Sequence, residues 1–290
     1  MVKKYSDLYL DARKALLPVD GMYAANMARE LLCAASGKTA EAVIADRDLY
    51  ASEEICAKVE DYVRRHIAGE PTAYIIGEWD FYGMTLTVTK DVLIPRDDTV
   101  AVTELAIKKA LFLKQNPRIL DLCTGSGCIG IAVAKRVQDA RVTLGDVSPE
   151  ALRIAKKNVA DQQLGARVTC MQIDAQKPAA AFLGKFDMIV SNPPYVTTAE
   201  METLDESVKN FEPHLALHGG ADGLDYYRAI LDNFTPALNP GGFICFEFGK
   251  GQENAVNDLL LQHGYEVQEY KHDNSYIIRA VSAQKKREDA

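Results

Sequence analysis

The sequence lacks the features of membrane proteins and of disulfide-rich secreted proteins. No window of its 290 residues approaches about 18 consecutive apolar residues, the length that spans a bilayer. The first residues are polar rather than an apolar signal core. The six cysteines are scattered through apolar stretches and contain no C-x-x-C pair. We therefore expect a cytoplasmic protein with reduced thiols, no export signal and no membrane association.

Positive charge and histidine are also scarce. Lys and Arg total 33 against 41 Asp and Glu, and a net charge of -8 provides no field that would hold a phosphate backbone. This disfavours a nucleic-acid substrate, although a local basic patch would suffice to bind one. The only close histidine pair, His214 and His218, has no third ligand nearby, so we expect no metal site. The remaining composition, 48% hydrophobic and 26% charged, is typical of a globular chain.

The apolar pattern changes twice along the chain. Up to about residue 75 it has helical spacing, with helices predicted over residues 8–18, 22–35 and 52–69. Alternation between residues 74 and 95 then predicts a strand pair, which we interpret as a β-hairpin linker over residues 76–98.

From Thr99 onward, short apolar strands alternate with helical stretches. Strands are predicted over residues 118–122, 141–144, 167–173, 186–191, 242–248, 265–270 and 276–281, and helices over 129–137, 149–160, 222–234 and 252–263. This alternation predicts an α/β fold with a parallel sheet covered by helices on both faces. Such sheets bind ligands at the carboxyl ends of their strands.

A glycine-rich loop follows the strand at residues 118–122. It consists of Cys123, Thr124, Gly125, Ser126 and Gly127. Glycines let a ligand approach the backbone, and the free amides at the start of the next helix favour electron-rich groups. With Gly130 the loop also matches G-x-G-x-x-G, which alone is weak support for a dinucleotide site. A glycine turn that only packs a helix on a strand is the structural alternative.

Two carboxylates flank this loop. Asp121, at the end of the strand, would repel a pyrophosphate but suits an α-ammonium group, such as that of S-adenosylmethionine. Asp146 ends the next predicted strand, 21 residues past Gly125, where it can accept hydrogen bonds from both ribose hydroxyls of either cofactor. Asp121 therefore favours S-adenosylmethionine over a dinucleotide.

A second motif, Asn192-Pro193-Pro194-Tyr195, follows the strand at residues 186–191. The two prolines lack N–H donors and lock the backbone, so its carbonyls face outward, and the Asn192 amide offers one acceptor and two donors. These acceptors suit a planar NH2 group, and Tyr195 supplies a flat face for it to pack against. A rigid surface turn is the structural alternative.

The two motifs together resemble class I S-adenosylmethionine methyltransferases that act on amino groups conjugated to planar systems. Residues 92–96 (Val-Leu-Ile-Pro-Arg) and 212–224 are similar to the release factor glutamine methyltransferase family, known as PrmC or HemK. This resemblance covers nearly the whole chain. It implies a seven-stranded methyltransferase sheet, S-adenosylmethionine as donor, and peptide chain release factors as partners, methylated on the side-chain amide nitrogen (N5) of glutamine in their Gly-Gly-Gln motif.

The resemblance also implies roles for individual residues. Cys123 to Gly127 form the loop on the methionine side, Asp146 binds the ribose, and Asp174 with Ala175 lies beside the adenine. Asn192 to Tyr195 bind the substrate glutamine, and Asn192 is also counted with the donor site. Residues 99–283 are the implied methyltransferase domain. Residues 1–75 are not needed for its sheet, so we interpret them as a substrate-docking domain.

Three positions depart from the family pattern. Cys123 stands where many members have glycine, so its contact with the donor is expected through the backbone. Ala175 replaces a bulky residue, which leaves the adenine packing open. Val100 stands where the family usually has an acid.

Two other functions stay open on the residues alone. A nucleic-acid methyltransferase acting on adenine N6 or guanine N2 uses the same Asn-Pro-Pro-Tyr motif on a flipped base, but the net charge of -8 argues against it. A nicotinamide-dependent oxidoreductase would account for the glycines but leaves residues 192–195 unexplained. Glu247, at the end of a late predicted strand, is a further candidate, as a helix cap or as a support behind the site.

Overall fold

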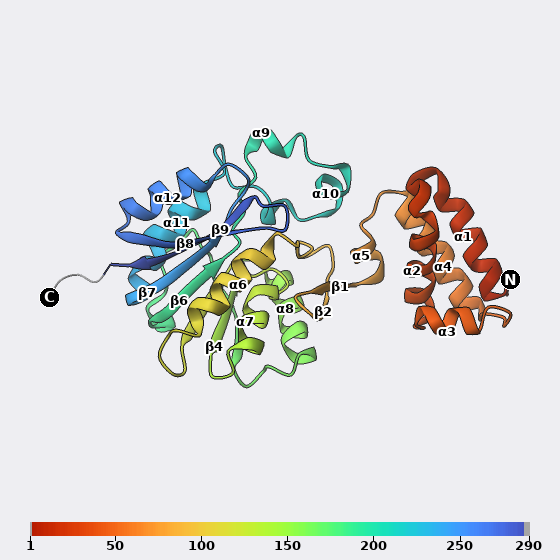
Figure 1. The fold of residues 1–290 in the computed structure, drawn as a ribbon, viewed down its shortest axis with the longest axis horizontal. Helices are drawn as coiled ribbons and strands as arrows, with labels where there is room; N and C mark the ends of the chain where they lie inside the picture. The colour runs from red at the N-terminus through yellow and green to blue at the C-terminus, as the bar shows by residue number, and fades with distance from the viewer. Residues whose placement is uncertain (1, 287–290) are drawn as a thin grey trace. The chain divides into compact units, whose positions relative to one another are not determined.

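The computed structural model describes residues 2–286 (Figure 1). Their contacts divide the chain into two units. The helical unit runs through Gly77 and also includes Glu206–Phe211. The sheet unit comprises Glu78–Asp205 and the chain from Glu212 onward.

The helical unit is a small bundle around its own apolar core. Its elements are α1 (Tyr5–Asp20), a 3-10 turn (Gly21–Tyr23), α2 (Ala24–Ser36), α3 (Ala40–Ala45), α4 (Glu53–Ile67), α5 (Thr72–Ile76) and α10 (Glu206–Phe211). The three predicted helices are confirmed as α1, α2 and α4, and the Ser52 side chain caps α4 by accepting from the Ile55 N–H. The sequence pattern missed α3 and α5, because helices of six and five residues are too short to show a period.

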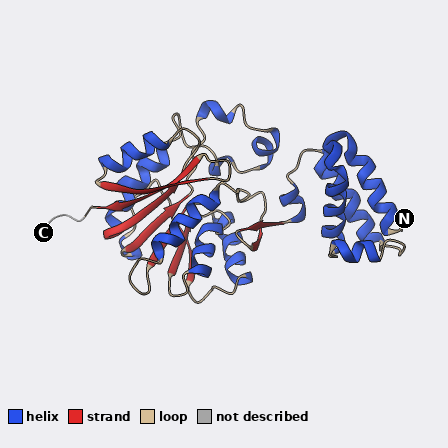
Figure 2. Ribbon diagram, viewed as in Figure 1, coloured by secondary structure: helices blue, strands red, loops and turns tan. Residues whose placement is uncertain are grey.

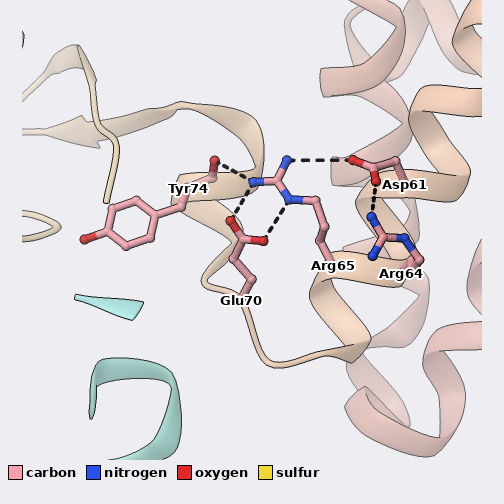
Figure 3. Close-up of polar contacts among 5 residues, drawn as sticks. All are labelled: Asp61, Arg64, Arg65, Glu70 and Tyr74. Atoms are coloured by element: carbon pink, nitrogen blue, oxygen red, sulfur yellow. Dashed lines mark hydrogen bonds and ion pairs between the residues drawn. The ribbon is translucent and has the colours of Figure 1, made fainter. Parts of the chain in front are cut away.

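Arg65 joins the end of α4 to the segment that leads to α5 (Figure 3). Its guanidinium donates two hydrogen bonds to Glu70, of 2.8 and 2.5 Å, and a third of 3.3 Å to the carbonyl of Tyr74. Asp61 lies 3.9 Å from the same guanidinium and also pairs with Arg64. This forked pair orders the chain where it leaves the bundle.

Within residues 2–286, seven strands form one sheet (Figure 2). They are β3 (Arg118–Leu122), β4 (Arg141–Asp146), β5 (Val168–Gln172), β6 (Phe186–Ser191), β7 (Leu238–Glu247), β8 (Tyr265–His272) and β9 (Ile278–Lys285), in the order β5-β4-β3-β6-β7-β9-β8. All seven predicted strands are thereby confirmed. The sheet is parallel except at β9, which is antiparallel to both β7 and β8. The link between β8 and β9 is too short for the crossover that parallel strands need.

Helices cover both faces of this sheet (Figure 1). On one face pack α6 (Thr99–Ala110), α7 (Cys128–Arg136) and α8 (Pro149–Asp161), and on the other α11 (Asp225–Phe234) and α12 (Glu253–Gln262). The sequence pattern predicted four of these five and missed α6. The short α9 (Thr198–Met201) and three 3-10 turns (Ala181–Leu183, His214–Ala216, Thr235–Ala237) lie in the connections.

The predicted hairpin, β1 (Glu78–Phe81) with β2 (Met84–Thr87), belongs to the sheet unit. Asn158 of α8 holds it there: the side-chain oxygen accepts from the Thr87 N–H at 2.7 Å, and the side-chain nitrogen donates to the Thr87 carbonyl at 3.0 Å. The same nitrogen donates to the carbonyl of Ser126 at 2.9 Å. One buried amide therefore links the hairpin to the glycine-rich loop.

The strand order places the two sequence motifs side by side. From β3 the chain continues to β4 on one side, whereas from β6 it continues to β7 on the other, so β3 and β6 flank a switch point. Leu122 pairs with Ser191 across these strands, and the Ser191 hydroxyl donates to the Leu122 carbonyl at 2.7 Å. Cys123 and Asn192 therefore leave the sheet from neighbouring positions.

Candidate active site

A cavity opens in the sheet unit at the carboxyl ends of β3, β4 and β6. The predicted site residues in its wall are Cys123, Thr124, Gly125, Ser126, Asp146, Asp174, Ala175, Asn192 and Pro194. The other four predicted site residues, Asp121, Gly127, Pro193 and Tyr195, do not line it. The structure therefore brings both motifs to one cavity, although four of the predicted residues are not part of its lining.

The glycine-rich loop turns through left-handed backbone conformations. Cys123, Gly125 and Gly127 have φ values of 57°, 53° and 85°. Gly125 has open space where a Cβ would stand, whereas a Cβ on Gly130 would lie 2.2 Å from a methyl of Leu144. Gly125 therefore leaves room for a ligand, and Gly130 allows α7 to pack closely on β4.

Asp121 lies beneath this loop. It is fully buried, and its Oδ2 accepts from the Thr124 hydroxyl at 2.6 Å and from the Gly130 N–H at 2.9 Å. Burial raises the pKa of its carboxyl to about 7, against the lowering effect of those two bonds. The geometry supports a role in shaping the loop from behind and does not favour the direct ammonium contact expected from the sequence.

Two polar atoms beside the loop are buried without a hydrogen-bond partner among residues 2–286, the Asp121 Oδ1 and the Ser126 Oγ. Buried polar atoms normally have partners. Of these two residues only Ser126 lines the cavity, so its hydroxyl fits a polar ligand there.

Asp146, at the end of β4, lines the cavity and is oriented by backbone donors. The Ser148 N–H donates to its Oδ1 at 3.0 Å and the Gly125 N–H to its Oδ2 at 2.9 Å. Burial raises the pKa of this carboxyl, against the lowering effect of the backbone bonds. Each oxygen keeps a second lone pair, so the carboxylate can still accept from two ribose hydroxyls.

The far end of the cavity is formed by Asp174, Ala175 and Tyr226. Asp174 pairs with Lys177 at 2.9 Å, and this bond is the main cause of its lowered pKa. Ala175 is buried and small. Tyr226, which sequence reasoning missed, adds an aromatic ring from α11, a helix distant in sequence from the loop, and burial raises its pKa to about 12.

The Asn-Pro-Pro-Tyr turn is held by glycines that follow it in the chain. A Cβ on Gly219 would lie 2.6 Å from the Pro194 carbonyl oxygen, and one on Gly223 would lie 2.3 Å from the Tyr195 carbonyl oxygen. The Gly219 N–H also donates to the Val196 carbonyl at 2.8 Å. The glycines of residues 219–223 therefore allow the two segments to touch through their backbones.

Tyr195 turns away from the cavity. Its carbonyl accepts from the side-chain nitrogen of Gln252 at 3.1 Å, and its ring packs against the apolar core on the α11 and α12 face. Burial raises the pKa of its phenol far above the ordinary value. The position of the ring supports anchoring of the turn rather than the flat substrate face expected from the sequence.

The two outer segments that resemble the family are joined by a buried carboxylate. Glu212 pairs with Arg96, and the Ile94 N–H donates to it at 3.2 Å. The Glu212 side chain is 1% exposed and that of Arg96 is 38% exposed, so the carboxylate is buried while the guanidinium reaches water. This contact fixes Leu93 and Pro95, which line the cavity, relative to Pro213, which also lines it.

Glu247 is the residue whose importance the sequence pattern left open. It is 1% exposed at the end of β7, and the Thr99 and Asn192 side chains beside its carboxyl lower its pKa. Its Oε2 has no hydrogen-bond partner among residues 2–286. Burial raises the pKa of its carboxyl to about 8. It does not line the cavity, but both of its partners do.

Residues 2–286 contain no metal-binding cluster and no helix that could span a membrane. No group of three or more His, Cys, Asp or Glu in that range could hold a metal ion. The ring of His218 bonds the Thr198 hydroxyl at 2.9 Å. Over the same range, every helix is too short or too polar to cross a bilayer. All six cysteines are free thiols.

Comparison with known families matches both units. Residues 7–77 match the family described as PrmC N-terminal domain, and residues 102–220 match the Methyltransferase small domain. The release factor glutamine methyltransferase of Geobacter sulfurreducens is 38% identical over 259 residues, covering 88% of each chain. That of Clostridium acetobutylicum is 36% identical over 241 residues, covering 83% of this chain and 84% of the relative.

Solved structures with the same fold are more distant. The hMettl16 catalytic domain, solved in complex with MAT2A 3'UTR hairpin 6, matches 84% of this chain and 86% of its own, with a TM-score of 0.56 at 14% identity. A methyltransferase from Pyrococcus furiosus matches 79% of this chain and 97% of its own, with a TM-score of 0.52 at 18% identity. At these identities the likeness shows the fold alone, and it confirms the predicted methyltransferase sheet.

Proposed function

We infer the function of this chain from the premise that it belongs to the release factor glutamine methyltransferase family. The chain is an S-adenosylmethionine-dependent methyltransferase that modifies the side-chain amide nitrogen (N5) of the glutamine in the Gly-Gly-Gln motif of peptide chain release factors. Its role therefore belongs to translation termination. The observation within the structure that best supports this is the meeting of the glycine-rich loop and Asn192 at one cavity.

The chemical problem is that an amide nitrogen is a poor nucleophile, since its lone pair is delocalised into the carbonyl. When bound, S-adenosylmethionine supplies an electrophilic methyl group on a sulfonium. The protein must therefore aim the nitrogen lone pair. Alignment of two bound reactants contributes about 7–11 kcal/mol, more than the ~1–3 kcal/mol of a single hydrogen bond, so positioning dominates.

Asn192 is the residue that positions the substrate amide. Its side-chain nitrogen donates to the Thr99 hydroxyl at 3.3 Å, which leaves the side-chain oxygen to accept one N–H of the substrate. The Pro193 carbonyl accepts the second N–H, although Pro193 itself stands behind the cavity wall. No general base is needed before attack, because the nitrogen becomes acidic only once it carries positive charge.

The donor is held by the loop and by the two acids beside it. The backbone of Cys123 to Gly127 contacts the methionine end, Asp146 accepts from the ribose hydroxyls, and Asp174 and Ala175 border the adenine. Tyr226 adds the aromatic surface that the small Ala175 does not provide. These assignments rest on the cavity lining and on the two lone pairs that Asp146 keeps.

The helical unit is proposed to dock the release factor. The cavity around Asn192 is too small to distinguish one glutamine from another, and a flexible loop bound at one point gains few contacts for its ordering cost. Specificity therefore requires a second surface. Several apolar side chains of the helical unit are exposed, among them Met22 at 85% and Tyr23 at 66%.

One assay tests this function directly. Intact release factor and nucleic acids are offered side by side with methyl-labelled donor, and the product is mapped by mass spectrometry. We expect one methyl group on the glutamine side chain of the Gly-Gly-Gln motif. Label on adenine or guanine instead would support the nucleic-acid methyltransferase alternative, and reduction of a substrate with NADH would support the oxidoreductase.

The compartment of the reaction is proposed to be the cytoplasm. The six cysteines are free, as expected of a protein kept under reducing conditions. Fractionation of cells that produce the tagged protein tests this, and recovery from the membrane or the exported fraction would contradict it.

A further inference from the structure

Three side chains from distant parts of the chain meet at the cavity wall. Thr99 begins α6, Asn192 follows β6 and Glu247 ends β7. The ladder between β6 and β7 pairs Ser191 with Phe246, so the next residue on each strand, Asn192 and Glu247, stand beside one another. Thr99 and Glu247 are 2% and 1% exposed.

The orientation of the Asn192 amide matters for the proposed reaction, on which this inference rests. With its oxygen toward the cavity, Asn192 accepts an N–H from the substrate NH2 group. With its nitrogen toward the cavity, two donors would face each other and the substrate would lose its acceptor. The asparagine itself has no preference between these states, so a neighbouring group must decide.

Thr99 alone does not decide the orientation. Its hydroxyl is both donor and acceptor, so it can bond either end of the amide. Glu247 as a carboxylate is an acceptor only. Its buried carboxyl faces the Thr99 hydroxyl and the Asn192 side chain, both of which lower its pKa, and its Oε2 has no hydrogen-bond partner among residues 2–286. Thr99 accepts from the Asn192 side-chain nitrogen at 3.3 Å. The acceptor-only group therefore sets the direction of the whole chain of bonds.

We propose that Glu247 is a positioning residue. It holds the nitrogen of the Asn192 side chain away from the cavity, and so presents the Asn192 oxygen to the glutamine substrate. Glu247 does not line the cavity, so it acts through Asn192 rather than on the reacting atoms. The Tyr227 hydroxyl donates to the Glu247 carbonyl at 2.7 Å, which fixes the backbone from which the carboxylate projects.

Protonation of Glu247 would weaken its control over the Asn192 orientation, since a neutral carboxylic acid has an O–H donor that can bond the Asn192 side-chain oxygen instead. The groups that face Glu247 come from four directions: Asp98 and Thr99 at the start of α6, Arg279 on β9, Tyr195 after β6 with Tyr227 on α11, and Cys128 on α7. Asp98 raises its pKa and Arg279 lowers it, but burial is the largest effect. We therefore expect kcat to rise with pH as Glu247 ionises, with the midpoint of the rise at about pH 8.

Two variants test the proposal. Glu247→Ala removes the acceptor, and kcat should fall on the order of a hundredfold with unchanged donor affinity, because a transition-state contact is misplaced. Glu247→Gln keeps one acceptor oxygen but cannot ionise. Its amide also carries a donor, like the protonated acid, so kcat should stay near the low-pH value of the native enzyme and should not rise with pH. Asp187→Asn is the matched control, since Asp187 is a buried carboxylate at the opposite end of β6 and should leave both kcat and its pH profile unchanged.

A spectroscopic measurement separates this proposal from the proposed function. The side-chain amide signal of Asn192 in a 15N spectrum reports its hydrogen bonds without any substrate, and it should shift in Glu247→Ala and with pH in the native protein. An unmoved signal, or a rise of kcat with pH that persists in Glu247→Gln, overturns the positioning role. Failure of the native enzyme to methylate release factor would overturn the proposed function. The Asn192 amide signal would still report whether Glu247 orients the side chain.

Discussion

The Asn-Pro-Pro-Tyr turn should be displaced by one methyl group added at Gly219. A Cβ there would stand 2.6 Å from the Pro194 carbonyl oxygen, 2.7 Å from the Tyr195 Cα and 3.0 Å from the Gly223 carbonyl oxygen. All three neighbours are backbone atoms, so no side chain can rotate out of the way. In Gly219→Ala the turn must therefore move as a unit.

The size of the displacement follows from these contacts. Reaching ordinary van der Waals contact at 3.4 Å requires Pro194 to retreat by about 0.8 Å. Pro194 and Asn192 both line the cavity, and a misplacement of about 1 Å can lower the rate on the order of a hundredfold. The overpacking itself should lower the free energy of unfolding by about 1–3 kcal/mol.

The assay compares kcat on release factor, donor affinity by calorimetry and urea unfolding. The methyl group of Gly219→Ala does not contact the glycine-rich loop, so donor affinity should be retained while kcat falls. Gly165→Ala is the control, because a Cβ at this exposed loop position meets no atom within 4 Å and its backbone needs no glycine. Native kcat in a folded Gly219→Ala protein would refute the argument that this glycine sets the position of the turn.

Three further predictions concern the donor, the loop and the docking surface. Asp146→Ala should weaken donor binding by about 2–3 kcal/mol, as for two lost hydrogen bonds in a partly buried site, and calorimetry that finds native affinity would exclude the ribose contact. Burial raises the pKa of Asp121 from 3.8 to about 7, so its contribution to stability is complete below pH 3.8 and is lost as the pH rises through 7. Asp121→Asn should therefore stabilise the fold more at about pH 9 than at about pH 5. A shift of the urea unfolding midpoint that is equal at the two pH values would contradict this. Met22→Asp should raise KM for intact release factor several-fold and leave KM for a short Gly-Gly-Gln peptide unchanged. Tyr276→Ser, at a similarly exposed position of the sheet unit, should change neither of these KM values. If Met22→Asp and Tyr276→Ser had the same effect on KM, docking by the helical unit would be contradicted.

Local patterns were enough to predict most of the elements. The three longer helices of the first unit and all seven strands of the sheet have an apolar period that survives without tertiary information, and Ser52 and Ser148 cap the helices that follow them. The pattern was insufficient for α6, which is apolar on most of its surface because it packs against the sheet and α7. It also missed α9 and α10, since four and six residues are too few to show a period.

The two motifs of the site were equally visible in the sequence. Each is a run of consecutive residues at the end of a strand, and parallel strands bring such ends to one edge of the sheet. For that reason nine predicted site residues line one cavity. The chemistry of a motif, a glycine turn or a pair of prolines, is set by its own covalent structure.

Only the tertiary structure decided which way the individual side chains face. Asp121 turns beneath the loop to bond Thr124 and Gly130, and the ring of Tyr195 packs into the core. Glu247 reaches Asn192 because β6 and β7 are neighbours in the sheet, although 55 residues separate them in the chain. These orientations depend on which surfaces each side chain can bury and which buried donors need an acceptor, and both are properties of packing between segments that are distant in sequence.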